Sequence, residues 1–318
     1  MPFAPGAVAF PDVTAIVVTW NPDIAAFRHA WSSYAARTRV LIVDNGSRPE
    51  IVAALRELES ATCSVIALPT NLGIASAINA GVAHVEQTNP AFYLLLDQDS
   101  VFEPDTLPAL LEASHALRQS GIGRPVVGPL PVEKESGVMI GMYGSMGLRA
   151  GDRQPFATES LYTSGMLVPA DLAREAPQKE AFFIDYVDTE WCYRVAKLHG
   201  AHTYVVPHAV IRHKVGDTAL PLHVRHQPLL VHGPIRQYFQ LRNAIWMLAC
   251  DYIPVRTRWR MALRCLARVS ILAACVAPRL TRMRFVGCAM IDGLRGKAGR
   301  WRFLPRGAQL GADRPFPH

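Results

Sequence analysis

The tripeptide Asp97-Gln98-Asp99 is the segment of this chain whose residue types point most directly to chemistry. It follows five apolar residues, 92–96, that predict a buried strand. Two carboxylates one residue apart repel each other unless a cation or a hydrogen-bond donor lies between them. Hard oxygen ligands suit Mg²⁺ or Mn²⁺, which also bind the phosphate oxygens of a substrate. The tripeptide therefore predicts a metal and phosphate site. The alternative is an ordinary acidic turn after a strand.

The elements that must position these carboxylates are short apolar runs that alternate with helical patterns. The expected strands are 13–19, 39–43, 64–68 and 92–96, and the expected helices are about 23–36, a segment ending near 60, and 73–84. Such alternation is typical of βαβ units and predicts an α/β fold with a mainly parallel sheet and flanking helices. Residues 125–151 are rich in Gly, Pro and Met, which indicates antiparallel strands or a mobile loop. A further amphipathic helix is expected near 188–198.

Polar side chains follow several of these strands directly. Asp44 comes after the second strand, Asn71 after the third, and Asp97 and Asp99 after the fourth. In an open parallel sheet the carboxyl ends of the strands line the ligand crevice. The sequence therefore predicts that these side chains lie along one edge of one cleft.

Several short motifs accompany the Asp97–Asp99 tripeptide in a fixed order. They are Thr19-Trp20-Asn21-Pro22, Val43-Asp44-Asn45-Gly46-Ser47, Asn71-Leu72-Gly73-Ile74-Ala75, Asn79-Ala80-Gly81, Thr163-Ser164-Gly165, the stretch 183–194, and His213. In this order and spacing, over about residues 12–245, the chain resembles the family-2 glycosyltransferases of the GT-A fold. Residues 94–100 and 184–191 look most like the bacterial rhamnosyltransferase branch, which uses dTDP-L-rhamnose.

The resemblance implies a domain organisation. Residues 1–245 would form a Rossmann-like GT-A catalytic domain, with a nucleotide-sugar half at about 12–125 and an acceptor half at about 126–245. Residues 246–318 would form a basic, amphipathic, helical C-terminal extension.

The resemblance also implies donor-binding residues. They are Thr19, Asn21, Asp44, Asn71, Gly73, Asn79, Asp97 and Gln98. Asp44 would accept a hydrogen bond from the imide N–H of thymine or uracil, as a carboxylate can. The alternative for Asp44 is a turn closed by its own side chain near Gly46. Asn71 and Asn79 flank the glycine-containing start of a helix, so they cap it or face the nucleotide.

The metal ligands implied by the resemblance are Asp97, Asp99 and His213. Asp97 would contact the ribose or the metal, and Asp99 would be the firmer ligand. A lone histidine is more often structural, so the position of His213 as a ligand depends on the resemblance. Arg212 and Lys214 could help to neutralise the diphosphate. The expected cofactor is Mg²⁺ or Mn²⁺.

Asp188 is the residue that we expect to act as catalytic base. Inverting transfer requires the acceptor hydroxyl to lose its proton as its oxygen attacks the anomeric carbon, and a carboxylate can accept that proton. Family members often have Glu-Asp here, whereas this chain has Val187-Asp188, so the preceding acid is missing. Asp185 and Glu190 are competing candidates.

Four further residues have an alternative structural reading or a predicted acceptor role. Glu190 and Arg194 lie four residues apart, a spacing that also suits a helical ion pair. Trp191 could stack on an acceptor sugar, and the alternative is a packed aromatic side chain. Gly165 is predicted to lie in the acceptor site.

The C-terminal segment is strongly basic. Residues 233–318 hold 16 Lys and Arg but 3 Asp and Glu, whereas the first 232 residues are mildly acidic. Residues 254–277 predict one helix with arginines every fourth residue, at 256, 260, 264 and 268. The apolar run 269–277 is too short to span a bilayer. The pattern favours an interfacial helix with arginines on lipid headgroups, and the alternative is a helix that packs on the catalytic domain. The far end of residues 279–318 is expected to be flexible.

Composition narrows the setting and the function class. The six cysteines are scattered without a C-x-x-C pair, and residues 1–11 lack the pattern of a secretory signal. We therefore expect a cytoplasmic enzyme, peripheral at the inner face of the plasma membrane. The resemblance to the rhamnosyltransferase branch implies that it transfers L-rhamnose from dTDP-L-rhamnose to a lipid-linked or glycolipid acceptor of a bacterial surface polysaccharide.

Two alternatives to this function remain. The first keeps the fold and changes the donor to a UDP-hexose or a galactofuranosyl nucleotide. The second is a basic nucleic-acid-binding protein, but the sequence has no helix-turn-helix, zinc-finger or aromatic RNA-binding motif. We expect no nucleic-acid partner.

Overall fold

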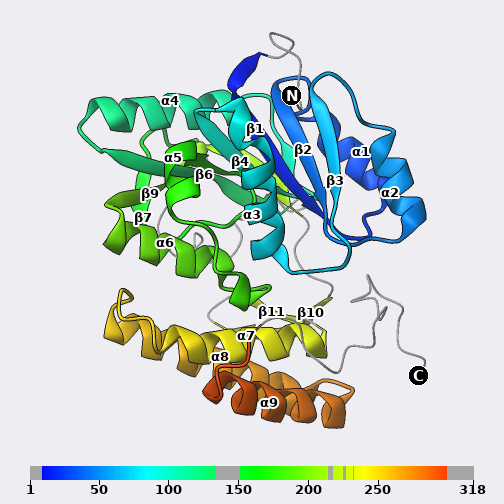
Figure 1. The fold of residues 1–318 in the computed structure, drawn as a ribbon. Helices are drawn as coiled ribbons and strands as arrows, with labels where there is room; N and C mark the ends of the chain where they lie inside the picture. Colours follow the sequence, from blue (N-terminus) through cyan, green and yellow to red (C-terminus); the bar gives the residue numbers. More distant parts are fainter. Residues whose placement is uncertain (1–8, 134–150, 214–217, 225–226, 232, 299–318) are drawn as a thin grey trace. The chain divides into compact units, whose positions relative to one another are not determined.

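The structure is a computed structural model that describes residues 9–133, 151–213, 218–224, 227–231 and 233–298 (Figure 1). The chain divides into two compact units. Unit 1 comprises residues 1–179 and 187–215, and unit 2 comprises residues 180–186 and 216–318. This division falls earlier in the chain than the predicted boundary at residue 245, because helix α7 (Pro234–Met247) packs against the two helices that follow it.

The first part of unit 1 contains the predicted alternation of strands and helices. Its elements are β1 (Phe10–Thr19), α1 (Ile24–Ser32), β2 (Thr38–Asp44), α2 (Pro49–Arg56), β3 (Cys63–Ala67), α3 (Ile74–Val85) and β4 (Phe92–Asp97). The four strands are parallel and lie in the order β3-β2-β1-β4. The predicted α/β class with a mainly parallel sheet is therefore confirmed.

The second part of unit 1 extends the same sheet. Its elements are β5 (Val101–Phe102), α4 (Thr106–Gln119), β6 (Arg124–Glu133), β7 (Phe156–Thr158), β8 (Met166–Pro169), α5 (Ala170–Glu175), α6 (Val187–Leu198) and β9 (Ala201–His213). The order continues β4-β8-β6-β9-β5, and β7 pairs with β9. Strand β8 runs antiparallel to β4 and β6, whereas β6 and β9 are parallel. Part of the Gly-, Pro- and Met-rich segment, residues 134–150, lies outside the described residues.

Helices cover both faces of this sheet, which explains why its inner strands are apolar without alternation. Along β1, Ile16 packs in one core cluster with residues of α3, α5 and α6. Its neighbours Ala15 and Val17 point to the other face and pack in a second cluster with residues of α1, α2 and α4. Successive side chains of a strand alternate between faces, so β1 needs apolar residues on both. The two cores pack the strands between helices on both faces.

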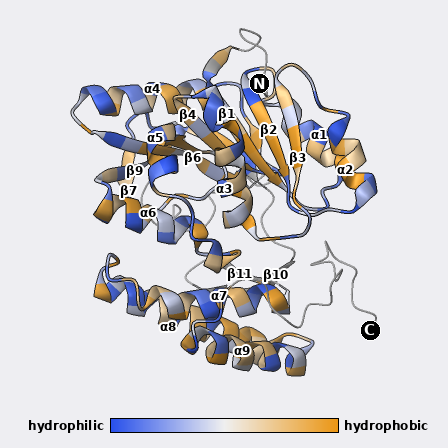
Figure 2. Ribbon diagram, viewed as in Figure 1, coloured by the Kyte–Doolittle hydropathy of each residue, from blue (hydrophilic) through white to orange (hydrophobic). Residues whose placement is uncertain are grey.

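Unit 2 is a small helical body with a β-hairpin. The hairpin joins the antiparallel strands β10 (Thr218–Val224) and β11 (Gln227–Val231). Helix α7 packs against α8 (Val255–Cys275) and α9 (Arg279–Leu294), which also pack against each other. The predicted helix at 254–277 is confirmed by α8. Figure 2 shows both apolar and hydrophilic residues along α8 and α9. Residues 299–318, where flexibility was expected, lie outside the described residues.

Candidate functional site

The Asp97–Asp99 tripeptide forms a tight turn at the carboxyl end of β4. Asp97 pairs in register with Val18 of β1. Its backbone N–H donates to the Ser100 hydroxyl at 3.1 Å, and the Ser100 N–H donates back to the Asp97 carbonyl at 3.2 Å. The Gln98 side-chain oxygen accepts a hydrogen bond from the backbone N–H of Trp20 at 2.8 Å, which ties the ends of β1 and β4 together. Asp97 is half-buried and Asp99 is exposed, so the second carboxylate faces solvent at this edge.

A short chain of hydrogen bonds connects this turn to Asp188. The hydroxyl oxygens of Ser100 and Ser164 lie 2.5 Å apart. The residue before Ser164, Thr163, donates its backbone N–H to Asp188 Oδ2 at 3.3 Å. Because Thr163 and Ser164 are adjacent, the Asp188 carboxylate lies close to the end of β4. Asp97 and Asp188, which are 91 residues apart in sequence, therefore lie near the same end of β4.

Gly165 is needed by the backbone of this loop. Its φ is +86°, a conformation that residues with a side chain rarely adopt, and an added Cβ would lie 2.4 Å from Pro129 Cγ. Its N–H donates to the Leu95 carbonyl at 2.8 Å, which continues the attachment of the loop to β4. These contacts account for the glycine, and its acceptor-binding role stays a prediction. The loop itself, residues 163–165, precedes β8 and is hydrogen-bonded to Leu95 of β4 and to Asp188 of α6.

Asp188 lies in the first turn of α6 and is half-buried. Its Oδ1 accepts from the Thr189 backbone N–H at 2.7 Å and from the Thr189 hydroxyl at 3.3 Å. A carboxylate offers about four acceptor positions on its two oxygens. The bonds from Thr163 and Thr189 fix the orientation of the carboxylate.

The two competing carboxylates have other structural tasks. Glu190 is completely buried, with Lys179 Nζ at 3.1 Å and Arg194 Nε at 2.8 Å from its Oε1. The predicted ion pair between Glu190 and Arg194 is thus confirmed. Lys179 is a second cation beside Glu190, and it was not predicted from the sequence. Asp185 pairs with Arg236 at 3.2 Å. Of the three candidates, Asp188 is the one whose oxygens are held by hydroxyl and backbone N–H donors at the end of β4.

Asp44 closes a turn at the end of β2. It is completely buried, and its oxygens accept from the Thr19 hydroxyl at 3.2 Å, from the Ser47 backbone N–H at 2.9 Å and from the Ser47 hydroxyl. Gly46 has a φ of +79°, and a Cβ there would lie 2.3 Å from the Thr70 carbonyl carbon. The side-chain turn that was the alternative reading of Asp44 is therefore present. The contact to a nucleotide base stays a prediction.

Asn21 belongs to the same group of turns. It has a left-handed φ of 43°, its backbone N–H donates to the Ser47 hydroxyl at 2.7 Å, and its side-chain oxygen accepts from the Arg48 N–H at 3.0 Å. The ends of β1 and β2 are thus locked together through Ser47. Thr19 and Asn21 lie at the strand ends where a donor was expected, and their contacts with a donor stay predictions.

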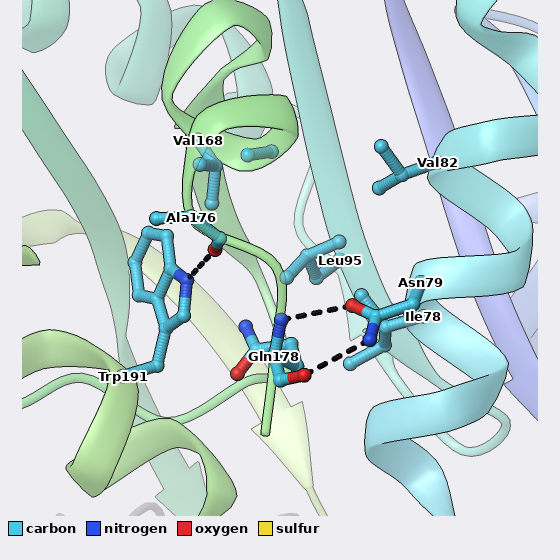
Figure 3. Close-up of a pocket in the computed structure, with 9 residues that line it drawn as sticks. Ile78, Asn79, Val82, Leu95, Val168, Ala176, Gln178 and Trp191 are labelled. Carbon is cyan, nitrogen blue, oxygen red and sulfur yellow. Dashed lines mark hydrogen bonds between the residues drawn. The ribbon is translucent and has the colours of Figure 1, made fainter. Parts of the chain in front are cut away.

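The predicted asparagines stabilise two further turns. Asn71 Oδ1 accepts from the Gly73 N–H at 3.0 Å and from the Asn45 side chain at 3.2 Å, immediately before α3. Asn79 on α3 binds the backbone of Gln178 reciprocally, at 2.8 and 2.9 Å (Figure 3). Asn71 is therefore a turn residue before the helix, and Asn79 attaches α3 to the segment after α5. Donor binding by Asn71, Gly73 and Asn79 stays a prediction.

Trp191 requires a correction. Its side chain is 1% exposed and packs in the core, and its Nε1 donates to the Ala176 carbonyl at 2.6 Å (Figure 3). A ring enclosed on both faces cannot stack on an acceptor sugar, so the acceptor-binding prediction for Trp191 is wrong. The alternative, a packed aromatic with its polar atom satisfied, is correct. Trp191 and Asn79 together fix the segment that includes Ala176 and Gln178.

The predicted metal site is only partly within the described structure. Among the described residues, no group of three or more His, Cys, Asp and Glu side chains is arranged to hold a metal ion. His213 ends β9, but its side chain is outside the described part of the chain, as is Lys214. Arg212 pairs with Glu103, so its guanidinium is engaged in an ion pair rather than held ready for a diphosphate. Residues 134–150 of the predicted acceptor half are likewise not described.

Ser100, Thr163 and Ser164 are the residues whose importance sequence reasoning missed. They stand inside the recognised motifs, but no role was assigned to them. Their hydrogen bonds connect the Asp97–Asp99 turn to Asp188. The available signal was their position beside the carboxylate turn and beside a glycine, but small hydroxyl residues have no distinctive spacing.

Comparison with known proteins shows that the chain is similar to glycosyltransferases. Residues 14–142 match the family model "Glycosyl transferase family 2". The chain is 25% identical over 301 residues to the dTDP-rhamnosyl transferase RfbF of Shigella flexneri. The alignment covers 92% of this chain and 98% of that protein. The resemblance to family-2 glycosyltransferases, and to a bacterial rhamnosyltransferase among them, is therefore confirmed.

Solved structures show the same fold at low sequence identity. S. aureus TarS 1–349 in complex with UDP-GlcNAc matches with a TM-score of 0.54 and 14% identity, covering 88% of this chain and 81% of that one. GalNAc-T7 with UDP, GalNAc and Mn²⁺ matches with a TM-score of 0.51 and 12% identity over 84% of this chain. This chain spans 58% of the GalNAc-T7 chain. The predicted GT-A fold is confirmed.

Proposed function

We propose that this chain, whose residues 14–142 match the family-2 glycosyltransferase model, transfers L-rhamnose from dTDP-L-rhamnose to a hydroxyl group of a lipid-linked or glycolipid acceptor. The observation that carries the proposal is the hydrogen-bonded path from Asp97 through Ser100, Ser164 and Thr163 to Asp188. It brings a carboxylate suited to proton abstraction to the strand end where a diphosphate would bind. The similarity to the Shigella flexneri dTDP-rhamnosyl transferase supports the choice of sugar.

Asp188 acts as the general base in this proposal. Its carboxylate accepts the proton of the acceptor hydroxyl while the acceptor oxygen forms a bond to the anomeric carbon. The bond between that carbon and the diphosphate oxygen breaks, and its electron pair leaves with the nucleoside diphosphate. Attack from the face opposite the leaving group inverts the anomeric centre, as for the water nucleophile of inverting glycosidases. The hydrogen bonds from Thr163 and Thr189 hold the carboxylate in one orientation for this proton transfer.

The carboxylates of the Asp97–Asp99 turn fit a divalent cation. Both are hard oxygen donors, they lie two residues apart at the end of β4, and one of them is exposed. We assign Asp99 and Asp97 as ligands of Mg²⁺ or Mn²⁺, with His213 as a third ligand. When bound, the cation neutralises the negative charge that develops on the leaving diphosphate. Gln98 contributes by holding the end of β4 against Trp20, so that the turn keeps its shape.

The strand ends of β1 and β2 would receive the nucleoside. Thr19 and Asp44 are paired in register and joined by a hydrogen bond, and Asn21 follows at the surface. Since Asp44 already accepts three hydrogen bonds, we propose that it shapes the base pocket and offers its remaining acceptor position to the imide N–H. Thymine and uracil share this N–H, so a UDP-hexose or UDP-galactofuranose is the alternative donor.

A donor panel tests the proposed function. Thermal melting of the full chain would be followed with dTDP-rhamnose, UDP-glucose, UDP-galactofuranose and GDP-mannose, each with Mn²⁺, with Mg²⁺ or with EDTA. A ligand present at 100 times its dissociation constant stabilises the folded protein by about 2.7 kcal/mol, enough to be measured for one donor against the others. The proposal expects the largest shift with dTDP-rhamnose and its loss in EDTA. Equal melting with all donors in the presence of metal would refute the nucleotide-sugar site.

Helices α8 and α9 support a membrane-associated acceptor. Within the described residues, no helix is long and apolar enough to cross a membrane. Both helices nevertheless expose large apolar side chains at helical spacing. These are Val255, Trp259, Leu263, Leu266 and Ile271 on α8, and Leu280, Met283, Met290, Ile291 and Leu294 on α9. An exposed apolar surface of this extent marks a protein or membrane contact.

The positive charge of α8 favours a membrane as the partner of this surface. Helix α8 carries five arginines and no acidic residue, and Arg256, Arg260 and Arg264 are exposed beside the apolar side chains. Arginines on the headgroups and apolar side chains in the acyl boundary are the arrangement of an interfacial helix on anionic lipid. We propose that α8 and α9 bind the inner face of the plasma membrane, where a lipid-linked acceptor for surface polysaccharide would be available.

A further inference from the structure

The segment just before Asp188 has an unfavourable backbone. Three residues with side chains, Phe183, Asp185 and Tyr186, have left-handed φ values of 64°, 61° and 63°. In this region the Cβ crowds the backbone, so such residues are rarely found there and almost never three within four positions. A backbone of this kind persists where surrounding contacts determine it, and such segments cluster at functional sites. The contacts that hold this segment are therefore of interest.

Asn243 of α7 binds the carbonyl groups of this segment. Its Nδ2 lies 2.9 Å from the Phe182 oxygen, 2.8 Å from the Ile184 oxygen and 2.9 Å from the Asp185 oxygen. Asn243 itself is completely buried. One amide group thus binds three carbonyls within four residues of the backbone. Loss of that amide would remove this donor from the Ile184 and Asp185 carbonyls.

Arg242 completes the clamp from the next position of α7. Its guanidinium donates to the Ala181 carbonyl at 3.1 Å and to the Phe182 carbonyl at 2.9 Å. It also donates from Nε and Nη2 to Asn243 Oδ1 at 3.0 and 2.9 Å, which fixes the asparagine amide with its donor group toward the segment. Arg242 and Asn243 therefore form one hydrogen-bonding device rather than two separate contacts.

Aromatic rings pack against the Arg242 guanidinium. Its central carbon lies 4.4 Å from the Trp246 ring centre and 4.8 Å from that of Phe239. Phe183, one of the strained residues, stacks on the same Phe239 ring with 4.8 Å between centroids. Cation–π contacts of a buried guanidinium are stronger than exposed ones because water does not screen them. The rings, the arginine and the strained segment form one packed cluster in unit 2.

We propose that Arg242 and Asn243 are positioning residues for the base Asp188. The proposal rests on the proposed function of Asp188. Only Tyr186 and Val187 separate Asp185, whose carbonyl Asn243 binds, from Asp188. The clamp therefore fixes the backbone that immediately precedes α6 in the chain, and Asp188 is the second residue of α6. Release of the clamp lets the three residues with left-handed φ relax and loosens the backbone that leads into Asp188, while the core contacts of α6 remain.

Kinetics of three variants test this inference. Asn243→Ala removes the amide, Arg242→Lys keeps the charge but loses the planar set of donors, and Val269→Ala removes apolar contacts of the same cluster without removing a hydrogen-bonding group. We expect Asn243→Ala and Arg242→Lys to lower kcat at least tenfold with the donor KM unchanged within twofold. Val269→Ala should keep kcat near that of the wild type, although it also destabilises the cluster.

Hydrogen exchange provides the second readout. Backbone amides of residues 181–188 should exchange faster in Asn243→Ala than in Val269→Ala under conditions where both are folded. If the wild type is active and Asn243→Ala has an unchanged kcat, this inference alone is overturned. An equal loss of kcat in Val269→Ala would also overturn it, because it would indicate an effect of stability. A wild type that transfers no sugar overturns the proposed function, and this inference with it.

Discussion

Helix α6 of unit 1 and helix α8 of unit 2 are both amphipathic and charged, but they differ in the burial and pairing of their charged side chains. On α6 the acid Glu190 is completely buried between Lys179 and Arg194. Helix α8 carries five arginines without any acid of its own and exposes Trp259 and Leu263 beside them, at 56% and 59%. A buried, paired charge stabilises one local structure. An exposed helix face with only positive charges and apolar side chains is suited to bind another surface. In the proposed function, α6 belongs to the part of the chain that performs chemistry and α8 to the part that binds the membrane.

The sharpest test of the chemical half is Asp188→Asn. The amide has nearly the same shape but cannot accept the proton of the acceptor hydroxyl. General-base catalysis contributes about 10²- to 10⁴-fold, so we expect kcat to fall by that factor. Donor affinity, measured by isothermal titration with dTDP-rhamnose and Mn²⁺, should remain close to the wild-type value. Glu57→Gln is the control, since its carboxylate forms an exposed pair with Arg28, and full activity in Asp188→Asn would remove the base assignment.

Glu190→Gln breaks the buried charge pairs of α6 and should act on stability. Removal of one partner leaves Arg194 largely buried beside a neutral group, and a loss of about 3 kcal/mol in the free energy of unfolding is expected. Arg28→Ala, which removes an exposed pair with Glu57, should cost less than about 1 kcal/mol. Urea denaturation measures both. If the kcat of folded Glu190→Gln fell as far as that of Asp188→Asn, Glu190 would have a catalytic role.

The membrane half is tested by the double variant Trp259→Ser and Leu263→Ser. Burial of a large apolar side chain contributes about 1.5–3 kcal/mol, so loss of two partly inserted ones should weaken binding to anionic vesicles at least about tenfold. Flotation with phosphatidylglycerol-containing and pure phosphatidylcholine vesicles provides the measurement. Phe156→Ser, which removes an exposed aromatic of unit 1, is the matched control. Equal flotation of the wild type, the double variant and Phe156→Ser would show that the exposed side chains of α8 do not bind the membrane.

Thiol labelling gives the smallest predicted effect and compares the same regions. Burial raises the pKa of the Cys192 thiol on α6 to about 12, and burial also raises the pKa of Cys265 on α8 to about 11. Both therefore stay protonated and unreactive at pH 8. Cys275 at the end of α8 is exposed and should react with iodoacetamide first. Mass spectrometry of the native protein checks the order, and early labelling of Cys192 would contradict the packing of α6.

The strands and their order along the first part of the fold were predictable from the sequence. Continuous apolar runs such as 92–96 are required where helices cover both faces of a sheet, and polar residues such as Asp97 mark where burial ends. The helix at 254–277 was equally readable from its arginine spacing. These features depend on local patterns, which a sequence displays directly.

The contacts at the site were less predictable because they depend on which side chains meet. Trp191 has the same identity whether it packs in a core or stacks on a sugar, and only the fold shows that it is enclosed. The Asp44 turn and the Ser100–Ser164 contact are made by small polar residues without distinctive spacing. The clamp of Arg242 and Asn243 joins residues about 60 positions apart, which periodicity cannot reveal.

The most direct test of the central claim is anomalous diffraction from crystals grown with dTDP and Mn²⁺. The account predicts a manganese peak within about 2 Å of the carboxylate oxygens of the Asp97–Asp99 turn, with the diphosphate bound to it. The carboxylate of Asp188 should line the same cavity on the side away from the diphosphate. A manganese and nucleotide bound at another place, with Asp188 outside their cavity, would contradict the account.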